Sequence, residues 1–286
     1  MQPTTTLLRL AHPRVRCVAA LSLASTGLLG GASAQATDRA IELRGGWFFP
    51  QFNTDLRVDS NLGVGTNINL EDDLGLESSA HTWFAGLQWR FFARHRLAVE
   101  YWKSERSSTY TLNKSITVED ENYAAGATIS TTFNLEMVPV SYSYSFIKTD
   151  RHELAASIGV HWSRLEFGLA GNLNTAVGGV AQDDGNASVS TSPDLPLPLI
   201  GADYGFKIND DWKLSTRAGY FSMNINDIDG SLIAAGIETE YWFSKHVAAG
   251  AGVDYFRLDV SANVDDFRGD AQYSYIGPKA FLKVGF

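Results

Sequence analysis

The sequence predicts an all-β protein, a closed antiparallel up-and-down transmembrane β-barrel of about ten strands, with eight strands as the less favoured number. Three observations lead to this prediction. Apolar and polar residues alternate over segments of about ten residues, which is the period of a β-strand. No segment beyond residue 34 has the ~18 consecutive apolar residues of a transmembrane helix. Short and long connections also alternate along the chain, as they do in transmembrane barrels.

Strict alternation defines the strands. Between residues 138 and 146, Val140, Tyr142 and Tyr144 share one face, and Ser141 and Ser143 share the other. The phase of the alternation changes near residues 136–138 and 163–165, which indicates either β-bulges or strands that leave the membrane toward a loop. The ten predicted strands are 41–49, 82–91, 97–101, 138–146, 154–162, 200–207, 212–220, 233–243, 247–255 and 275–286.

Connection lengths predict the orientation of the barrel. Short turns are expected near 93–95, 149–152, 209–210 and 244–246, and longer connections near 50–79, 107–127, 170–194, 223–230 and 261–271. Periplasmic turns are short and outer loops are long in this architecture, so both chain termini are expected to face the periplasm. A soluble β-sandwich also alternates, but glycines, serines and charges of both signs on the polar face fit a crowded barrel interior better.

The first 34 residues have the pattern of a cleaved signal peptide. Arg9, Arg14 and Arg16 precede an uncharged stretch that ends at an Ala-Ser-Ala cleavage pattern, residues 32–34. The single cysteine, Cys17, lies within this stretch and not directly after the cleavage pattern, which argues against a lipoprotein anchor. We therefore expect a signal peptide at 1–34 and an outer-membrane barrel domain at 35–286, with no further domain after it.

Composition supports a chain with one face in lipid. Charged residues are 19% of the sequence, below the usual ~25%, and aromatic residues are 12%. The net charge of −9 argues against a nucleic-acid partner, because phosphate binding needs a basic surface. Aromatic side chains at both ends of the apolar face predict two interfacial belts. One belt contains Trp47, Phe49, Trp83, Tyr101, Trp162, Tyr220 and Tyr255, and the other Phe91, Phe146, Phe206, Trp212, Tyr241, Phe243 and Phe286.

The last strand ends in Ala280-Phe281-Leu282-Lys283-Val284-Gly285-Phe286. Alternating apolar residues with the terminal Phe286 resemble the signal that the barrel-assembly machinery of Gram-negative bacteria reads. The chain thus resembles the small Gram-negative outer-membrane barrels, OmpA/OmpW-like in the broad sense. The segment 67–76, Asn-Ile-Asn-Leu-Glu-Asp-Asp-Leu-Gly-Leu, is similar to a stretch in poorly characterised proteobacterial barrels of this kind. The resemblance implies an outer-membrane location and contact with lipid and lipopolysaccharide.

The polar face carries charges of both signs along the predicted interior. Ten strands enclose little more space than side chains fill, and charges in so confined a space must be paired. The favoured interpretation is a salt-bridged plug, and the alternative is a narrow polar conduit. Glu100, Glu238, Glu240, Arg90 and Arg217 are the first residues to mutate in a test of conduction. The predicted lumen charges are Glu42, Arg44, Arg90, Glu100, Asp203, Lys207, Lys213, Arg217, Glu238, Glu240, Asp254, Lys279 and Lys283.

The predicted outer loops are acidic. Clustered carboxylates are oxygen ligands for Ca²⁺ or Mg²⁺, so divalent cations are possible partners there, although an ordinary solvated surface explains the same residues. No stretch has the spacing of an EF-hand, and no ligand set follows. The loop carboxylates are Asp55, Asp59, Glu71, Asp72, Asp73, Glu77, Glu119, Asp120, Glu121, Asp183, Asp184, Asp227, Asp229, Asp265 and Asp266.

Enzymatic signals are weak, and we predict no enzyme and no cofactor. His161 and Ser163 are two residues apart, which resembles the His-x-Ser strand pair of outer-membrane lipid A deacylases. Arg164 stands where that family has Asn, and Glu166 is the one nearby carboxylate. Ten strands also resemble the omptin proteases, but we find no Asp-x-His pair at the outer strand ends. No P-loop, dinucleotide-binding glycine pattern or zinc-protease motif occurs.

The sequence therefore predicts an integral outer-membrane barrel with a structural, surface-interaction or weakly permeable role. The first alternative is a small-solute, porin-like channel. The second is a lipid A-modifying or proteolytic barrel enzyme.

Overall fold

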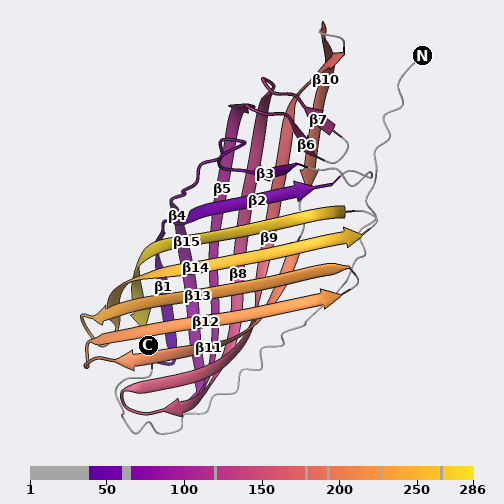
Figure 1. Cartoon of the computed structure of the whole chain (residues 1–286). Coiled ribbons are helices and arrows are strands. Elements are labelled where there is room, and N and C mark those ends of the chain that lie inside the picture. The colour runs from indigo at the N-terminus through magenta and orange to yellow at the C-terminus, as the bar shows by residue number, and fades with distance from the viewer. Residues whose placement is uncertain are drawn as a thin grey trace, which may run out of the picture. The chain divides into compact units, whose positions relative to one another are not determined.

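The computed structural model describes residues 39–59, 66–118, 121–177, 180–191, 194–225, 227–264 and 267–286, and all regular structure in them is β-strand. Ten antiparallel strands form a ring in which hydrogen bonds between the first and last strands complete the closure (Figure 1). The ten-stranded barrel prediction is confirmed, and the predicted signal peptide lies outside the described residues. The ring order is β1 (Ile41–Phe48), β4 (Thr82–Phe92), β5 (His95–Thr111), β8 (Thr128–Lys148), β9 (His152–Val177), β11 (Asp194–Lys207), β12 (Trp212–Ile225), β13 (Ile228–Trp242), β14 (Val247–Val264) and β15 (Phe267–Gly285).

Both described ends of the barrel meet at one rim, which we call the turn end. The Ile41 and Phe286 backbones hydrogen-bond in both directions, with N–O distances of 3.2 and 2.9 Å. The four connections at this rim, residues 93–94, 149–151, 208–211 and 243–246, are as short as predicted. We call the opposite rim the loop end.

Three of the five predicted long connections are wrong. Residues 170–194 are one of them, because β9 pairs with β10 (Val180–Thr191) up to Val177 opposite Val180. β12 and β13 remain paired up to Ile225 opposite Ile228, and β14 and β15 up to Val264 opposite Phe267. Residues 223–230 and 261–271 are therefore mostly hairpin strands. The sequence pattern missed them because their outward residues, such as Asn224 and Ser261, are polar and give no apolar alternation.

The change of phase along β8 and β9 has a cause other than a bulge. The β8–β9 register is continuous from Ile129 to Ser145, so the bulge interpretation is wrong. On β8 the outward face changes from apolar to polar at Glu136, and the inward face changes from serines to buried Met137, Leu135 and Phe133. The alternation persists while the two faces exchange polarity.

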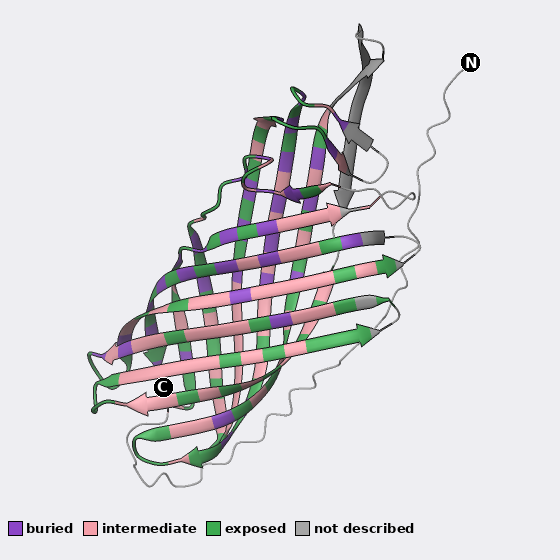
Figure 2. Cartoon of the chain, viewed as in Figure 1, coloured by how far each residue is buried: buried purple, intermediate pink, exposed green. Residues whose placement is uncertain are grey.

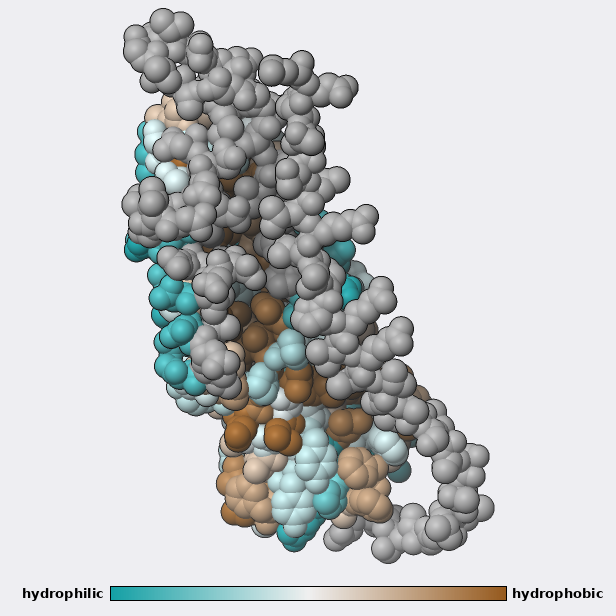
Figure 3. All heavy atoms as spheres, turned by 90° about the vertical axis from the view of Figure 1, so that its right-hand side faces the viewer, coloured by the Kyte–Doolittle hydropathy of each residue, from teal (hydrophilic) through white to brown (hydrophobic). Residues whose placement is uncertain are grey.

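The barrel consequently has two zones. In the lower zone, toward the turn end, outward residues are apolar, and Leu282, Ile200 and Trp47 are 61%, 67% and 63% exposed. In the upper zone, toward the loop end, outward residues are polar, and β9 carries Arg164 and Glu166 there. Figure 3 shows hydrophobic residues gathered in the lower part of one face and hydrophilic ones above them, and Figure 2 shows the buried residues concentrated on the upper strands.

The remaining strands build the upper zone. β2 (Gln51–Val58) continues from β1 along β15, and β3 (Asn67–Asn69) pairs with β2. β10 (Val180–Thr191) extends the β9–β11 hairpin, since Thr191 opposite Phe167 and Asp194 opposite Arg164 belong to one register. β6 (Ile116–Val118) and β7 (Glu121–Tyr123) form a separate hairpin.

A seam opens between β11 and β12 above Ile200, where their pairing stops. Both strands continue past this point, β11 up to Asp194 and β12 up to Ile225. Even-numbered residues of β11 direct their N–H toward β12, as Ile208 does by donating to the Trp212 carbonyl at 2.9 Å. Pro196 and Pro198 occupy two such positions and cannot donate, so the prolines end the ladder.

Replacing both prolines should extend the ladder. In the double variant Pro196→Ala/Pro198→Ala, the new amides face Asn224 and Ser222 in the register that Ile200 and Tyr220 define. Each added backbone hydrogen bond contributes about 1 kcal/mol, so amide exchange at Ser222 and Asn224 should slow about fivefold. Hydrogen exchange followed by mass spectrometry measures this, and unchanged exchange would contradict the assignment of the seam to the prolines.

Candidate functional site: the lumen

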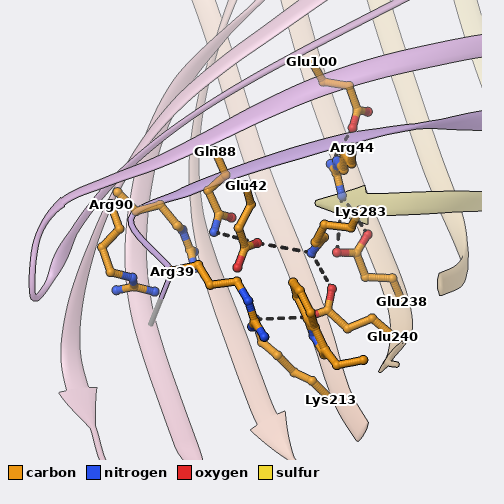
Figure 4. A network of polar contacts seen from close by, with 12 residues as sticks. Arg39, Glu42, Arg44, Gln88, Arg90, Glu100, Lys213, Glu238, Glu240 and Lys283 are labelled. Atoms are coloured by element: carbon orange, nitrogen blue, oxygen red, sulfur yellow. Dashed lines mark hydrogen bonds and ion pairs between the residues drawn. The ribbon is translucent and has the colours of Figure 1, made fainter. Parts of the chain in front are cut away.

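The inward faces of the lower zone bring all thirteen predicted lumen charges into the interior of the ring. Figure 4 shows part of this set, including Glu42, Arg44, Glu238 and Lys283. The alternation of each strand places them there, because successive side chains of a strand point to opposite faces. Several are largely removed from solvent: Glu240 and Lys279 are each 3% exposed and Lys283 is 5% exposed. Their charges group into three clusters.

The first cluster surrounds Glu238 of β13. Its carboxylate lies 3.1 Å from Arg44 Nη1 and 3.0 Å from Lys279 Nζ. Asp254 accepts from Arg217 at 2.7 Å and lies 3.0 Å from Lys279. Glu100 completes the cluster by pairing with the second guanidinium nitrogen of Arg44. Three cations and three carboxylates from six strands thus tie the two sides of the barrel together.

The second cluster lies nearer the turn end. Lys283 pairs with Glu240 and lies 3.3 Å from Glu42. Lys213 Nζ lies 3.6 Å from Glu240 Oε1. The Trp242 indole N–H also donates to Glu240 at 3.2 Å, and the Arg39 guanidinium lies 3.2 Å from the centre of the Trp242 ring. Two lysines and two carboxylates balance each other in this cluster.

The third cluster contains two charges that the sequence analysis missed, Arg96 and Glu153. Arg90 donates to Glu153 at 2.9 Å, and Arg96 donates to Asp203 at 2.7 Å. Ser143 adds a hydrogen bond to Asp203 at 2.7 Å. Arg96 has the parity of Glu100 and Glu153 that of Ser157, so extending the alternation one or two residues toward the turns would have found both.

These pairings offset the free-energy cost of burying charged groups in the interior. A buried ion without a partner costs several kcal/mol, and the cost falls only where good geometry and further hydrogen bonds satisfy it. The three clusters together hold seven cations and seven carboxylates. Lys207, another predicted lumen charge, lies near the turn end, opposite Lys213 in the β11–β12 register.

The charged lumen is not completely filled. A cavity of about 220 Å³ lies within it and reaches from Gln88 and Glu42, near the turn end, to Trp102 and Tyr275. Small residues of β8, β9, β11 and β12 line part of it, among them Ser141, Ser157, Gly159, Gly201 and Ser215. The charged residues Glu153, Asp203, Lys213 and Arg217 come from the same strands, so the lower lumen is a polar chamber in which charged and small side chains alternate along the wall.

Aromatic rings close this chamber on the loop side. Phe48, Trp102 and Tyr275 contact one another with ring centroids 5.2 to 5.6 Å apart. Phe256 stacks on Tyr275 at 5.2 Å, and His161 stacks on Phe256 at 5.9 Å. The rings come from five strands, β1, β5, β9, β14 and β15, so they cross the lumen from wall to wall. We call these five residues the aromatic layer.

A buried ion pair lies on the loop side of this layer. Arg106 Nη1 is 2.6 Å from Glu71 Oε1, and the Arg106 guanidinium lies over the Phe52 and Phe133 rings at 4.3 and 5.0 Å. The Glu71 carboxylate also accepts from the Thr54 amide at 2.8 Å. Glu71 is thus an interior ligand of Arg106 and not a solvated loop carboxylate.

The segment that carries Glu71 is part of the 67–76 stretch singled out in the sequence. Asn69 caps a single turn, since its side chain accepts from the Asp72 amide at 2.9 Å. Leu70 and Leu74 are each 1% exposed. Gly75 ends the turn with a φ of 67°, and a β-carbon there would meet the Tyr110 ring at 2.6 Å. The stretch therefore packs into the upper core.

The proposed His-x-Ser pair has no catalytic geometry. His161 and Ser163 both face the interior, and in the described part of the chain neither His161 Nδ1 nor Ser163 Oγ has a hydrogen-bond partner. Glu166 lies on the opposite, outward face, where it accepts from Asn134 at 3.0 Å. The three groups of an acyl-transfer site are thus not brought together.

The predicted loop carboxylates are dispersed. Asp73 lies 2.9 Å from Lys114, and Asp59 lies 2.7 Å from Arg57. Among the described residues, no group of three or more His, Cys, Asp or Glu side chains could hold a metal ion. Residues 119–120 and 265–266, and the side chains of Glu121, Asp183 and Asp184, lie outside the described part. In the described residues no helix has the length and apolarity to cross a membrane.

Solved structures share this architecture. The outer membrane protease OmpT from Escherichia coli superimposes with a TM-score of 0.57 at 11% identity, covering 86% of this chain and 96% of that chain. The fold is that of an outer-membrane β-barrel. The translocator domain of autotransporter NalP from Neisseria meningitidis superimposes with a TM-score of 0.41 at 14% identity, covering 82% of this chain and 87% of that chain. The Pseudomonas putida toluene transporter TodX superimposes with a TM-score of 0.34 at 10% identity, covering 87% of this chain and 91% of that chain.

Only the architecture follows from these superpositions, because the identities are low and the TM-scores of the NalP and TodX superpositions are below 0.5. No protein-family model matches the sequence, and no curated protein matches it. Function therefore has to be argued from the lumen itself.

Removing one member of the Glu238 cluster should destabilise the barrel. Glu238→Gln leaves Arg44 and Lys279 without their shared counter-ion, and breaking a buried pair costs about 3–5 kcal/mol. The matched control is Glu136→Gln, which removes an exposed partner of Arg164 and should cost less than about 1 kcal/mol. Urea unfolding of the two variants in lipid vesicles gives both values. Equal stabilities would contradict a structural role for the cluster.

Proposed function

We propose that this chain is an integral outer-membrane barrel that is closed to solutes and presents its upper zone at the cell surface. The aromatic layer across the lumen is the observation that carries the proposal. A layer in which each ring contacts the next should obstruct the passage of hydrated ions between the chamber and the loop end. The role that follows is structural or one of surface interaction.

The outward surface supports the membrane location. The apolar lower zone is flanked by aromatic residues at both rims, with Trp83 and Trp162 toward the upper zone and Trp212 and Phe243 toward the turn end, each more than 40% exposed. Such rings prefer the headgroup level of a bilayer. Lys103 and Arg164 come directly after the upper aromatic residues on the outward faces of β5 and β9. The first charged outward row thus fits the bilayer boundary.

The proposal also places the remaining sequence features. Residues 1–34 act as a cleaved signal peptide for export. Phe286 acts as the terminal residue that the assembly machinery reads. The turn end, with both ends of the barrel domain, faces the periplasm, and the loop end faces outward toward lipopolysaccharide.

A small-solute channel is the second candidate, and the chamber of about 220 Å³ favours it. In this alternative the aromatic layer would have to move aside, since it separates the chamber from the loop end. The proposal assigns no enzymatic activity, and overexpression should leave lipid A unchanged on mass spectrometry.

Planar-bilayer recording tests the closed barrel. The unmodified protein should show no conductance steps, whereas Phe48→Ala/Trp102→Ala should show them, because the substitutions remove two contacting rings from the aromatic layer. A matched pair, Trp47→Ala/Tyr101→Ala, removes outward rings and should stay silent. Steps from the unmodified protein would favour the channel. A silent Phe48→Ala/Trp102→Ala barrel would show that the barrier lies elsewhere, for example at the Glu71–Arg106 pair.

Spin labels test the membrane position. A nitroxide at Leu282→Cys should be accessible to oxygen but not to a water-soluble nickel chelate, because this residue faces outward in the lower zone. At Lys103→Cys the accessibilities should be reversed. The only native cysteine, Cys17, lies in the predicted signal peptide and does not interfere after cleavage. Nickel access at position 282 would remove the proposed lipid contact.

A further inference from the structure

The seam between β11 and β12 lies at the upper border of the outward apolar surface. Its lower end is the last pair of the ladder, Ile200 and Tyr220, whose side chains are 67% and 56% exposed. Above this pair, Pro196 of β11 is opposite Trp162 of β9. The seam therefore starts within the apolar lower zone and rises to the upper aromatic residues, which mark the proposed headgroup level.

Both strands stay paired on their other sides along the seam. β11 remains paired with β9 up to Asp194 opposite Arg164, and β12 remains paired with β13 up to Ile225 opposite Ile228. Each strand thus keeps its extended conformation although the ladder between the two is interrupted. The seam is a feature of the barrel wall and not the frayed end of a hairpin.

The inward residues beside the seam are apolar and incompletely buried. Leu197 and Leu199 of β11 and Phe221 of β12 pack against the upper core but are only partly buried. On β8, where the ladder with β9 is continuous, the inward residues Met137 and Leu135 are 1% and 3% exposed. The hydrophobic core is therefore less well covered at the seam than behind a complete ladder.

Leu199 closes the lower end of this apolar surface. A β-carbon on Gly219 of β12 would meet Leu199 Cδ2 at 2.6 Å, so the leucine side chain reaches across from β11 onto the backbone of β12. The cavity of the charged chamber reaches Leu199 and Gly219 from the turn side. Above this leucine the inward residues of both strands are apolar, so the seam is chemically distinct from the chamber.

The chemistry of the seam favours a hydrocarbon chain as its occupant. Pro196 and Pro198 cannot donate hydrogen bonds, so an added β-strand could not form a regular ladder along β11. A hydrocarbon chain needs no hydrogen bonds, and its nearest source is the bilayer that the outward apolar zone contacts in the proposed function. Because the partly buried surface rises to the headgroup level, a chain drawn into the seam removes that surface from water, which is favourable.

We propose that the seam holds one hydrocarbon chain of an outer-leaflet lipid, which lies between β11 and β12 against Leu197 and Phe221. The polar part of the lipid stays outside the barrel, at the level of Trp162. This inference rests on the proposed membrane position and orientation of the barrel. It adds to that function a defined lipid-binding site in the barrel wall.

Photolabelling from the bilayer tests the site. The protein is reconstituted in phosphatidylcholine vesicles in which a fraction of the lipid carries a diazirine near the end of one acyl chain, and fragment-ion mass spectrometry maps the labelled residues. The outward Leu282 should be labelled because the lower zone contacts lipid. Leu197 and Phe221 should be labelled as well, although they face inward. Met137 and Leu135, which face inward behind the continuous β8–β9 ladder, should stay unlabelled.

Closing the seam should remove the inward labels. In Pro196→Ala/Pro198→Ala, labelling of Leu197 and Phe221 should fall at least about fivefold, because opening the seam then costs the added backbone hydrogen bonds. The matched control, Pro278→Ala, replaces a proline of β15 away from the seam and should leave labelling unchanged. If hydrogen exchange shows that the double variant does not extend the ladder, Leu197→Trp takes its place, since the larger ring fills the space between the strands and should lower labelling of Phe221. Heat-dependent gel mobility shows whether each variant is folded.

The outcomes separate this site from the membrane position on which it rests. Labelling of Leu282 without labelling of Leu197 and Phe221 would overturn the site and leave the membrane position intact. An unlabelled Leu282 would remove both. Equal labelling of Met137 and Leu197, or inward labels that persist in the closed-seam variants, would show that lipid chains reach the interior by another route and would also overturn the site.

Discussion

Closure of the strand ring by the β1–β15 ladder is the constraint on which the rest of this structure depends. A closed ring satisfies backbone hydrogen bonds strand by strand and leaves no free edge in the lower zone. It also gives every strand an inside and an outside, so each residue's parity decides its surroundings. The ion-pair clusters, the chamber and the outward apolar surface are three consequences of that single geometric fact.

The exchange of polarity between the two zones follows from what surrounds the ring. Where the outside is apolar, the inside can hold polar groups, because ion pairs such as Arg44–Glu238 satisfy them. Where the outside is polar, the inside has to supply a hydrophobic core, and Phe133, Leu135 and Leu169 do so. The same strand serves both zones without a change of register. The strands that extend beyond the apolar lower zone thus enclose a small hydrophobic core, which stabilises the upper zone.

Sequence reasoning found most of the fold, because alternation and turn length are local signals. It placed Glu42, Arg217 and Asp254 in the interior from parity alone. It missed the features that do not follow from the parity of a residue along its strand. Residues 223–225 have no apolar alternation on their outward face, so they were predicted to belong to a loop. Glu71 looked like one loop carboxylate among many, although it pairs with Arg106, 35 residues away in the sequence. Partners so distant are set by how the strands curve, which no local pattern records.

The lumen has to satisfy two opposing requirements, pairing of its buried charges and space for an open cavity. Paired charges in the clusters hold the walls together, and their stability requires that each charge keep its partner. An open chamber requires small residues on part of the wall, such as Ser157 and Ser215. The most enclosed cations, Lys279 and Lys283, come from β15, whereas the serines that leave the cavity of about 220 Å³ open come from β8, β9 and β12. Gly201 is small for another reason: a β-carbon there would come within 2.6 Å of the Ala218 carbonyl oxygen, so the close approach of the neighbouring strand requires glycine. Serines at inward positions such as 141, 157 and 215, in place of larger side chains, are what distinguishes a chamber from a plug.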